Sequence, residues 1–308
     1  MKILVTGASG FVGRRLVEAL ELKGHQVTSL VRHSSNPNYP SGDVVITDLT
    51  DSLSMFDVVT KTKPDIVVHL GARTPVSYSF SQQNDYQHQN YLGTVNVVNA
   101  CVRQVKVPRL VFASTMESYG WQPEGVLIKE TAQQNPASPY AVAKVAGEHY
   151  VRMAGVAYKL PYVIVRCCNT YGGKRFDRNY SLIEYATSTM LKGEDLYIGT
   201  PNAVRDFIHV DDHVKAYMHV IGSDKTGIFN FGSEITMTIG EVVEKIKSML
   251  NYGKEIIKTF PPGYPNRNVV ENWLSLDSTK ARKEFGWKPM SFDEGLKKTI
   301  DYWRSYSA

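Results

Sequence analysis

The stretch Thr6-Gly7-Ala8-Ser9-Gly10-Phe11-Val12-Gly13 follows directly on a short apolar run, Ile3-Leu4-Val5. Its glycines have the spacing Gly-x-x-Gly-x-x-Gly, at a point where a strand is expected to turn into a helix. Glycine permits the tight turn, a close approach of the backbone to a pyrophosphate, and close packing of helix on strand. The N–H groups at the start of such a helix bind phosphate. We therefore predict a dinucleotide-binding turn with contacts from Gly7, Gly10, Phe11, Val12 and Gly13.

Apolar runs alternate with helical patterns through the first half of the chain. Strands are predicted over residues 2–6, 26–31, 44–47, 65–70, 109–114 and 162–167. Helices are predicted between them, over residues 11–23, 52–61, 86–103 and 139–158. This alternation indicates an α/β fold with a doubly wound parallel sheet of the Rossmann type, covered by helices on both faces.

The pattern changes after Cys168, where loops become longer. We expect residues 1–170 to form a dinucleotide-binding Rossmann domain and residues 171–308 a smaller C-terminal α/β substrate lobe, with about 204–230 returning to the first domain. The helices of the lobe are predicted over 181–192, 238–250, 278–284 and 293–304. Because ligands of such sheets bind outside the carboxyl ends of the strands, the lobe is expected to close over that edge.

The end of the second strand bears on the choice of cofactor. NAD sites usually carry an acidic residue there, which binds the ribose 2′-hydroxyl. Here Val31 fills that position, and Arg32, Ser34 and Ser35 follow it. A guanidinium and hydroxyls suit a 2′-phosphate, although Arg32 is also compatible with a solvated loop. We predict NADP in preference to NAD.

Tyr140 and Lys144 form a Tyr-x-x-x-Lys pattern. Proline at the first turn favours a helix that begins at Pro139, and residues four apart then share one face. An ammonium beside a phenol stabilises the phenolate and lowers its pKa from about 10. Tyr140 is therefore predicted to take a hydroxyl proton while a hydride leaves the same carbon.

The glycine turn, Ser114-Thr115 and the Tyr-Lys pair, in this order, resemble the extended short-chain dehydrogenase/reductase family, in particular its NAD(P)-dependent nucleotide-sugar epimerases and dehydratases. The resemblance implies that Asp48 and Leu49 contact adenine. It implies a catalytic Ser or Thr, and counting back from Tyr119-Gly120 selects Thr115 rather than Ser114. It also implies a homodimer formed through the helices over 86–103 and 139–158.

The same resemblance extends to the substrate. Residues 203–212 read Ala-Val-Arg-Asp-Phe-Ile-His-Val-Asp-Asp and resemble a string of the family. The resemblance implies that Arg205 binds the diphosphate of a nucleotide sugar. Asn169 matches a residue that binds the same region. Arg267 lies ten residues before Asp277 and matches the arginine of a family Arg-Pro-Gly-Asp string, whose remainder is absent here.

Glu117 distinguishes possible reactions within the family. The pattern Thr-x-Glu-x-Tyr-Gly resembles nucleotide-sugar dehydratases, in which the Glu removes a proton beside a new ketone; decarboxylases and 4-keto reductases carry it too. Dehydratases of the dTDP-glucose kind have Asp before the Glu, and here Met116 stands there. The strings around Arg32, Tyr140 and Arg205 look most like the GDP-mannose 4,6-dehydratase and 4-keto-reductase branch.

Three functions are compatible with these residues. The leading one is a nucleotide-sugar epimerase/dehydratase that transiently oxidises C4 of a nucleotide-diphosphate hexose. An NADPH-dependent reductase of a nucleotide 4-keto-6-deoxy sugar is the alternative. A non-catalytic cofactor-binding regulator is the third, and it is disfavoured because such proteins typically lose the Tyr or the Lys.

Composition excludes several other classes. The formal charge of +5 is dispersed among 308 residues, which does not indicate a nucleic-acid partner. Three cysteines, Cys101, Cys167 and Cys168, match no metal spacing, so no metal is expected. No apolar run approaches the roughly 20 residues of a membrane span. Since the first strand begins at Lys2, we expect no signal peptide and a cytoplasmic protein.

Overall fold

The computed structural model describes residues 1–32, 42–173, 181–263 and 273–307. Its centre is a seven-stranded sheet with the order β10-β6-β5-β4-β1-β2-β3, in which every pair of neighbours is parallel. The strands are β1 (Lys2–Thr6), β2 (Gln26–Val31), β3 (Asp43–Ile46), β4 (Ile66–His69), β5 (Arg109–Thr115), β6 (Tyr162–Cys167) and β10 (Gly227–Phe231). The predicted Rossmann-type α/β fold is confirmed.

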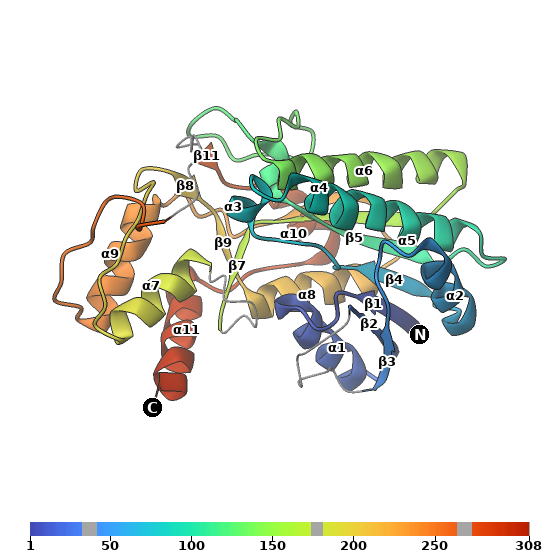
Figure 1. The fold of residues 1–308 in the computed structure, drawn as a ribbon, viewed down its shortest axis with the longest axis horizontal. Coiled ribbons are helices and arrows are strands. Elements are labelled where there is room, and N and C mark those ends of the chain that lie inside the picture. Colours follow the sequence, from blue (N-terminus) through green and yellow to red (C-terminus); the bar gives the residue numbers. More distant parts are fainter. Residues whose placement is uncertain (33–41, 174–180, 264–272, 308) are drawn as a thin grey trace.

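Helices cover both faces of the sheet (Figure 1). On one face α1 (Phe11–Leu22) packs against α8 (Val210–Ile221). On the other face α5 (Gly93–Val102) packs between α2 (Ser52–Thr62) and α6 (Pro139–Ala157). A hydrophobic core lies on each face of the sheet, and successive side chains of β1 point into one or the other. Ile3 and Val5 belong to the core under α1 and α8, and Leu4 belongs to the core under α2, α5 and α6. A strand buried on both faces explains the continuous apolar run in the sequence.

The helix predicted over 86–103 is interrupted by a π-helical segment. It consists of α4 (Gln83–Tyr86), a π-helical segment η1 (Gln87–Leu92) and α5. Within η1 the buried amide of Asn90 accepts a hydrogen bond from the backbone N–H of Arg73 at 2.7 Å and donates one to its carbonyl at 2.9 Å. These bonds hold the loop after β4, which contains the short helix α3 (Val76–Ser79), against the helix. A π-turn of this kind has no signature in hydrophobic spacing.

The smaller lobe has its own core, formed by α7 (Leu182–Leu191), α9 (Ile239–Leu250) and α11 (Phe292–Ser307). Two short parallel pairs connect it to the rest: β7 (Asn169–Tyr171) with β9 (Phe207–His209), and β8 (Val204–Arg205) with β11 (Trp273–Leu274). The chain crosses from β9 into α8 and β10 before it returns through α9, and α10 (Thr279–Phe285) packs on β10. The strand β10 was not among the strands predicted from the sequence.

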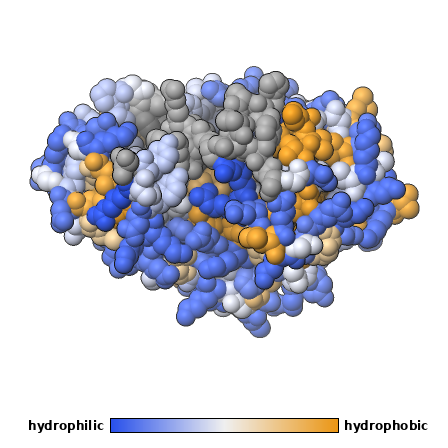
Figure 2. Space-filling model, turned by 90° about the horizontal axis from the view of Figure 1, so that it is seen from below, coloured by the Kyte–Doolittle hydropathy of each residue, from blue (hydrophilic) through white to orange (hydrophobic). Residues whose placement is uncertain are grey.

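In the part of the chain that the structure describes, none of the helices is long and apolar enough to cross a membrane. Within those same residues no cluster of His, Cys, Asp and Glu is arranged to hold a metal ion. Figure 2 shows one face of the molecule, which is mostly hydrophilic and carries its hydrophobic residues in separate patches.

Candidate active site

A cleft of about 670 Å³ runs along the carboxyl edge of the sheet. Its walls include residues at or just after the ends of β1, β2, β4, β5 and β6, and residues of α1, α6 and α8. Most residues that the sequence analysis selected line this one cleft: Gly7, Gly10, Phe11, Val12, Gly13, Arg32, Leu49, Thr115, Glu117, Tyr140, Lys144 and Asn169. Residues from distant parts of the chain therefore meet where a doubly wound sheet binds its ligands.

The glycine turn leaves no room for side chains. Gly7 has a φ of +68°, and a Cβ there would lie 2.7 Å from the backbone of Gly71. A Cβ on Gly13 would lie 2.3 Å from the carbonyl oxygen of Gly7. Gly10 is the N-cap of α1 and makes no side-chain capping bond, so the first N–H groups of the helix face the cleft unscreened by a side chain. This cradle fits the pyrophosphate of a dinucleotide.

The end of the cleft beside β2 is lined by Arg32 and Leu49. Asp48 does not line it. Its Oδ1 accepts hydrogen bonds at 2.8 Å from both the N–H and the hydroxyl of Thr50, and at 3.3 Å from the amide of Gln89. The contact of Asp48 with adenine stays a prediction. Ser34 and Ser35, which were expected to support a 2′-phosphate, lie outside the described residues.

Tyr140 and Lys144 share one face of α6, as the spacing predicted. The helix begins at Pro139, and the hydroxyl of its N-cap Ser138 accepts the N–H of Ala141 at 3.1 Å. Both side chains line the cleft, with 8% of Tyr140 and 3% of Lys144 exposed. Thr115, at the end of β5, also lines it. Close packing on a long helix holds these groups in fixed positions, which proton transfer requires.

The charge of Lys144 is controlled by burial. Desolvation lowers the pKa of Lys144 to about 8, while the carboxylate of Glu148, one turn further along α6, raises it. The ammonium lies 4.4 Å from the centre of the Phe112 ring. His69, on β4, stays neutral because burial lowers its pKa to about 3. Lys144 therefore keeps most of its positive charge at neutral pH and loses that charge as the pH rises through about 8.

Glu148 belongs to a buried polar network behind the cleft. Its carboxylate accepts two bonds from the Arg166 guanidinium, at 2.9 and 2.5 Å, and one from Gln134 at 2.9 Å. The hydroxyl of Ser114 also donates to it. The hydroxyl oxygen of Thr115 accepts the N–H of Glu117 at 3.2 Å, whereas the hydroxyl of Ser114 donates its proton to Glu148. Thr115 is therefore the more available of the two as a hydrogen-bond donor.

The side chains of Glu117 and Met116 point in different directions although the two residues are adjacent in the chain. Both lie on the short 3-10 helix η2 (Met116–Tyr119), which follows β5. Glu117 is half-buried and lines the cleft. Met116 is fully buried and packs in the core with the residues under α1 and α8. The carboxylate thus faces the same space as Tyr140, and the thioether does not.

The predicted substrate residues are not all brought together. Asn169 lines the cleft. Arg205 is half-buried on β8 and its Nη1 donates to the carbonyl of Val204 at 2.8 Å; it does not line the cleft as the described residues form it. Arg267 lies outside the described residues. Their contacts with a diphosphate stay predictions.

The cleft also contains residues that sequence reasoning missed. Leu70, Gly71 and Ala72 follow β4, and Cys167 and Cys168 lie at the end of β6, so the rule that ligands bind beyond strand ends was a usable signal for them. His213 and Tyr217 come from α8 and line the same cleft. For these two residues the sequence offered no signal, because only the tertiary structure brings α8 to the cleft.

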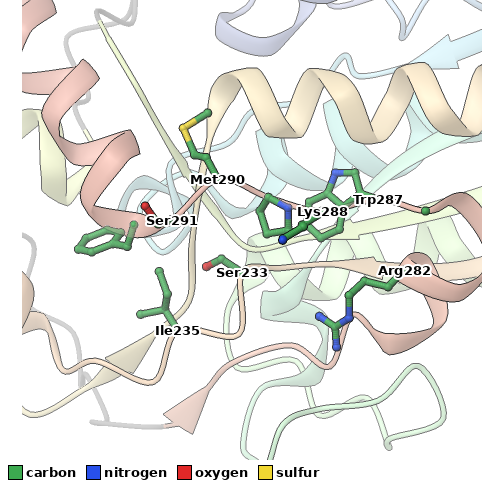
Figure 3. A pocket seen from close by; sticks show the side chains of 10 residues that line it. Ser233, Ile235, Arg282, Trp287, Lys288, Met290 and Ser291 are labelled. Atoms are coloured by element: carbon green, nitrogen blue, oxygen red, sulfur yellow. The ribbon is translucent and has the colours of Figure 1, made fainter.

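A second hollow, of about 600 Å³, lies between the loop after β10 and the segment that joins α10 to α11 (Figure 3). It is lined by Ser233, Ile235, Arg282, Gly286, Trp287, Lys288, Pro289, Met290, Ser291 and Phe292. Arg282 is paired with Glu234 at 2.6 Å, and the buried Trp287 donates its indole N–H to the carbonyl of Asp212 at 3.3 Å. None of the site residues predicted within the described part of the chain lines this hollow.

Comparison with known proteins agrees with this architecture. Residues 3–232 match the model of the NAD dependent epimerase/dehydratase family. The chain is 30% identical to a dTDP-glucose 4,6-dehydratase of Streptomyces niveus, over 100% of this chain and 94% of that protein. A UDP-glucose 4-epimerase of Thermotoga maritima, solved with UDP-glucose, superimposes with a TM-score of 0.92 at 28% identity, covering 100% of both chains. A UDP-glucose 4-epimerase of Thermus thermophilus, solved with NAD, superimposes with a TM-score of 0.88 at 32% identity, covering 99% of both chains.

The chain therefore belongs to the NAD dependent epimerase/dehydratase family. It is an enzyme of the nucleotide-sugar epimerase/dehydratase class, as its fold and its cleft predicted.

Proposed function

We propose that this enzyme oxidises C4 of a nucleotide-diphosphate hexose with bound NAD(P) and uses the resulting ketone for epimerisation or dehydration. The observation that carries the proposal is the presence of Thr115, Glu117, Tyr140 and Lys144 in the same cleft as the glycine turn. The base that takes the hydroxyl proton and the cradle for the cofactor are thereby parts of one site. Catalysis of this kind needs both within reach of one carbon.

Each of the cleft residues has a separate role in this reaction. The glycine turn would hold the pyrophosphate, and a bound nicotinamide would supply the hydride acceptor for C4. Tyr140 removes the proton from the C4 hydroxyl, and the ammonium of Lys144 stabilises the phenolate that this requires. The hydroxyl of Thr115 hydrogen-bonds the reacting oxygen. Burial of Tyr140 and Lys144 excludes water and strengthens the attraction between their charges.

Tyr140 is tested by its replacement with phenylalanine. Tyr140→Phe should lower turnover by at least about a hundredfold, since general-base catalysis contributes about 10²–10⁴-fold, and should leave cofactor affinity nearly unchanged. Tyr150→Phe is the matched control, because Tyr150 lies on the same helix and its hydroxyl donates to Asn99 at 2.9 Å, away from the cleft. Activity of Tyr140→Phe within tenfold of the unchanged enzyme contradicts the assignment.

Glu117 decides the fate of the ketone after the oxidation. A ketone at C4 acidifies the proton on C5, and a carboxylate in the same cleft is a suitable base for it. If Glu117 acts there, the reaction is a dehydration, and deuterium from solvent enters at C5. Glu117→Gln then abolishes both while the bound cofactor is still reduced. Conversion of substrate without deuterium at C5 excludes this role and favours epimerisation.

A reductase that consumes NADPH and converts a nucleotide 4-keto sugar is the second candidate. Two observations favour it. Met116, buried in the core, occupies the position of the acid that dTDP-glucose dehydratases use for the leaving hydroxyl. Arg32 lines the cleft at the end of β2, where a 2′-phosphate would lie.

We propose accordingly that the enzyme prefers NADP(H) to NAD(H). Arg32 replaces the acid that would bind the ribose 2′-hydroxyl, and its charge attracts the additional phosphate. Titration of both cofactors into the protein measures the preference, and Arg32→Ala should remove it. Arg14→Ala is the matched control, because it also removes an arginine but one that does not line the cleft. Equal affinities in the unchanged protein contradict the proposal.

We further propose that the enzyme belongs to the GDP-mannose 4,6-dehydratase and 4-keto-reductase branch of the family, because the strings around Arg32, Tyr140 and Arg205 resemble that branch; these strings do not name the base or the sugar. The test is incubation with a panel of UDP-, GDP-, dTDP- and CDP-hexoses, with products followed by mass and NMR. An unchanged mass with altered stereochemistry indicates epimerisation, and loss of water indicates dehydration. Product that forms only from a 4-keto sugar with added NADPH indicates the reductase.

We propose that the enzyme forms a homodimer through the outer side of α6 and η1. Val142, Met153 and Val156 lie on α6 with 44%, 39% and 77% of their surfaces exposed, and Leu92 on the neighbouring η1 is 37% exposed. Their spacing along α6 forms one apolar stripe. Light scattering at micromolar concentration should give the mass of a dimer, and Val156→Lys should shift it towards a monomer. A monomer in the unchanged protein refutes the proposal.

A further inference from the structure

His213 is a buried side chain of the cleft with one ring nitrogen unsatisfied. It lies in the first turns of α8, lines the cleft and is 8% exposed. Its Nδ1 is 2.8 Å from the hydroxyl of Thr170, and its ring stacks on Tyr217 with 5.2 Å between centroids. Its Nε2 has no hydrogen-bond partner within the described part of the chain. A buried polar atom without a partner calls for an explanation, since leaving it so costs about 1–3 kcal/mol.

The position of His213 along the cleft indicates which part of a ligand it meets. The sheet order places β2 at one end of the cleft, followed by β1, β4, β5 and β6. The adenosine half of a dinucleotide lies beside β2, and its pyrophosphate lies at the glycine turn after β1. The second mononucleotide must therefore extend towards β5 and β6. Cys167 and Thr170, at and just after the end of β6, line the cleft together with His213.

The chemistry of His213 restricts the group that it can bind. The ring is neutral at physiological pH, because burial lowers the pKa of His213 to about 4. A neutral imidazole carries no charge that would attract a phosphate or a carboxylate, so an uncharged polar group is the better match. Its Nε2 is a donor or an acceptor according to how the proton is shared with Thr170. A primary amide suits both cases, because it offers an N–H and a carbonyl together.

We propose that His213 binds the carboxamide of the nicotinamide ring through Nε2, with Thr170 fixing the tautomer and Tyr217 the plane of the ring. The inference rests on the proposed function, since it requires a nicotinamide cofactor in this cleft. It makes His213 a positioning residue, because the carboxamide sets the rotation of the nicotinamide and hence which face of the ring meets the substrate.

The test compares two ligands that differ by the nicotinamide alone. NAD⁺ and NADP⁺ are titrated into each variant, and so are ADP-ribose and 2′-phospho-ADP-ribose, which lack the ring. In His213→Leu the dissociation constant of the full cofactor should rise about tenfold, which corresponds to about 1.4 kcal/mol. That of the ADP-ribose ligands should stay within about twofold. His213→Gln, whose amide can replace Nε2, should restore most of the affinity.

His219→Leu is the matched control, because His219 lies exposed at the far end of the same helix. Unchanged cofactor affinity in His213→Leu overturns the inference and leaves the proposed function intact. Equal weakening of the full cofactor and of ADP-ribose also overturns it, because the loss then comes from the fold of α8. Failure of the unchanged protein to bind either cofactor overturns the proposed function, and the inference with it.

Discussion

The buried ion pair of Glu148 and Arg166 gives the sharpest prediction for stability. The two side chains are 1% and 2% exposed, on α6 and β6, and are joined by two hydrogen bonds at 2.9 and 2.5 Å. Glu148→Leu removes the carboxylate and leaves the guanidinium of Arg166 buried without a counter-charge. The hydroxyl of Tyr119, 2.8 Å from Nη1, still accepts a bond but carries no charge.

The expected magnitude follows from this geometry. Breaking a buried pair by removing one partner destabilises by about 3–5 kcal/mol, because the remaining charge stays desolvated. Replacing both partners by apolar residues of similar volume is often neutral or stabilising. We therefore expect Glu148→Leu to lower the free energy of unfolding by about 3–5 kcal/mol. The double variant with Arg166→Met should recover most of this loss, so the coupling energy of the pair should exceed about 2 kcal/mol.

Activity should not recover together with stability. The carboxylate of Glu148 raises the pKa of Lys144, which is about 8 in the unchanged protein. Its removal should therefore lower the pKa of Lys144 in the single and the double variant. The upper limb of the pH profile of kcat/KM should then move to lower pH in both. Urea unfolding measures stability, and steady-state kinetics between pH 6 and 9 measure the profile. A loss below about 1 kcal/mol in Glu148→Leu, or additive losses in the double variant, refutes the assigned role of the pair.

The remaining predictions concern separate features. Gly13→Ala places a methyl group 2.3 Å from the carbonyl of Gly7 and should cost about 1–3 kcal/mol of stability, whereas Gly253→Ala, where nothing lies within 4 Å, should cost little in the same urea titration. His213 has a pKa of about 4 in the folded protein against an ordinary value of 6.5, so below pH 6.5 the unfolded chain binds a proton that the fold excludes. Stability should fall towards pH 4 by up to about 1.4 kcal/mol per pH unit more in the unchanged protein than in His213→Leu; parallel curves contradict this. Thr238→Ala breaks the capping box of α9 and should cost about 1 kcal/mol, and no change in thermal midpoint refutes that role.

Features written in neighbouring residues were predictable from the sequence. The bounds predicted for β1, β2 and β6 coincide with those of the structure, because continuous apolar runs and turn residues mark a strand locally. The start of α6 was marked by Pro139. The glycine spacing indicated the turn after β1, where the absence of a Cβ is required. Tyr140 and Lys144 share a face because helical geometry alone aligns residues four apart.

Features that depend on contacts between distant residues were decided by the tertiary structure. The strand β10 joins the sheet by pairing with β6, which lies far earlier in the chain, and this pairing is a contact between distant residues. The orientation of Met116 into the core and of Glu117 into the cleft follows from the packing of η2 beneath the sheet edge. Nothing in their order along the chain distinguishes the two.

Contacts between distant residues also decided the positions of the polar groups around the site. In the sequence Glu148 looks like an ordinary surface charge on a helix and Arg166 is a single charge within an apolar strand; only the packing of α6 on β6 joins them as a buried pair. His213 reaches the cleft because α8 packs on α1 across the sheet from Tyr140. The sequence by itself determined the fold, the cofactor turn and the Tyr-Lys pair, since local geometry encodes them. The surroundings that tune these groups arose from burial, which depends on the whole fold.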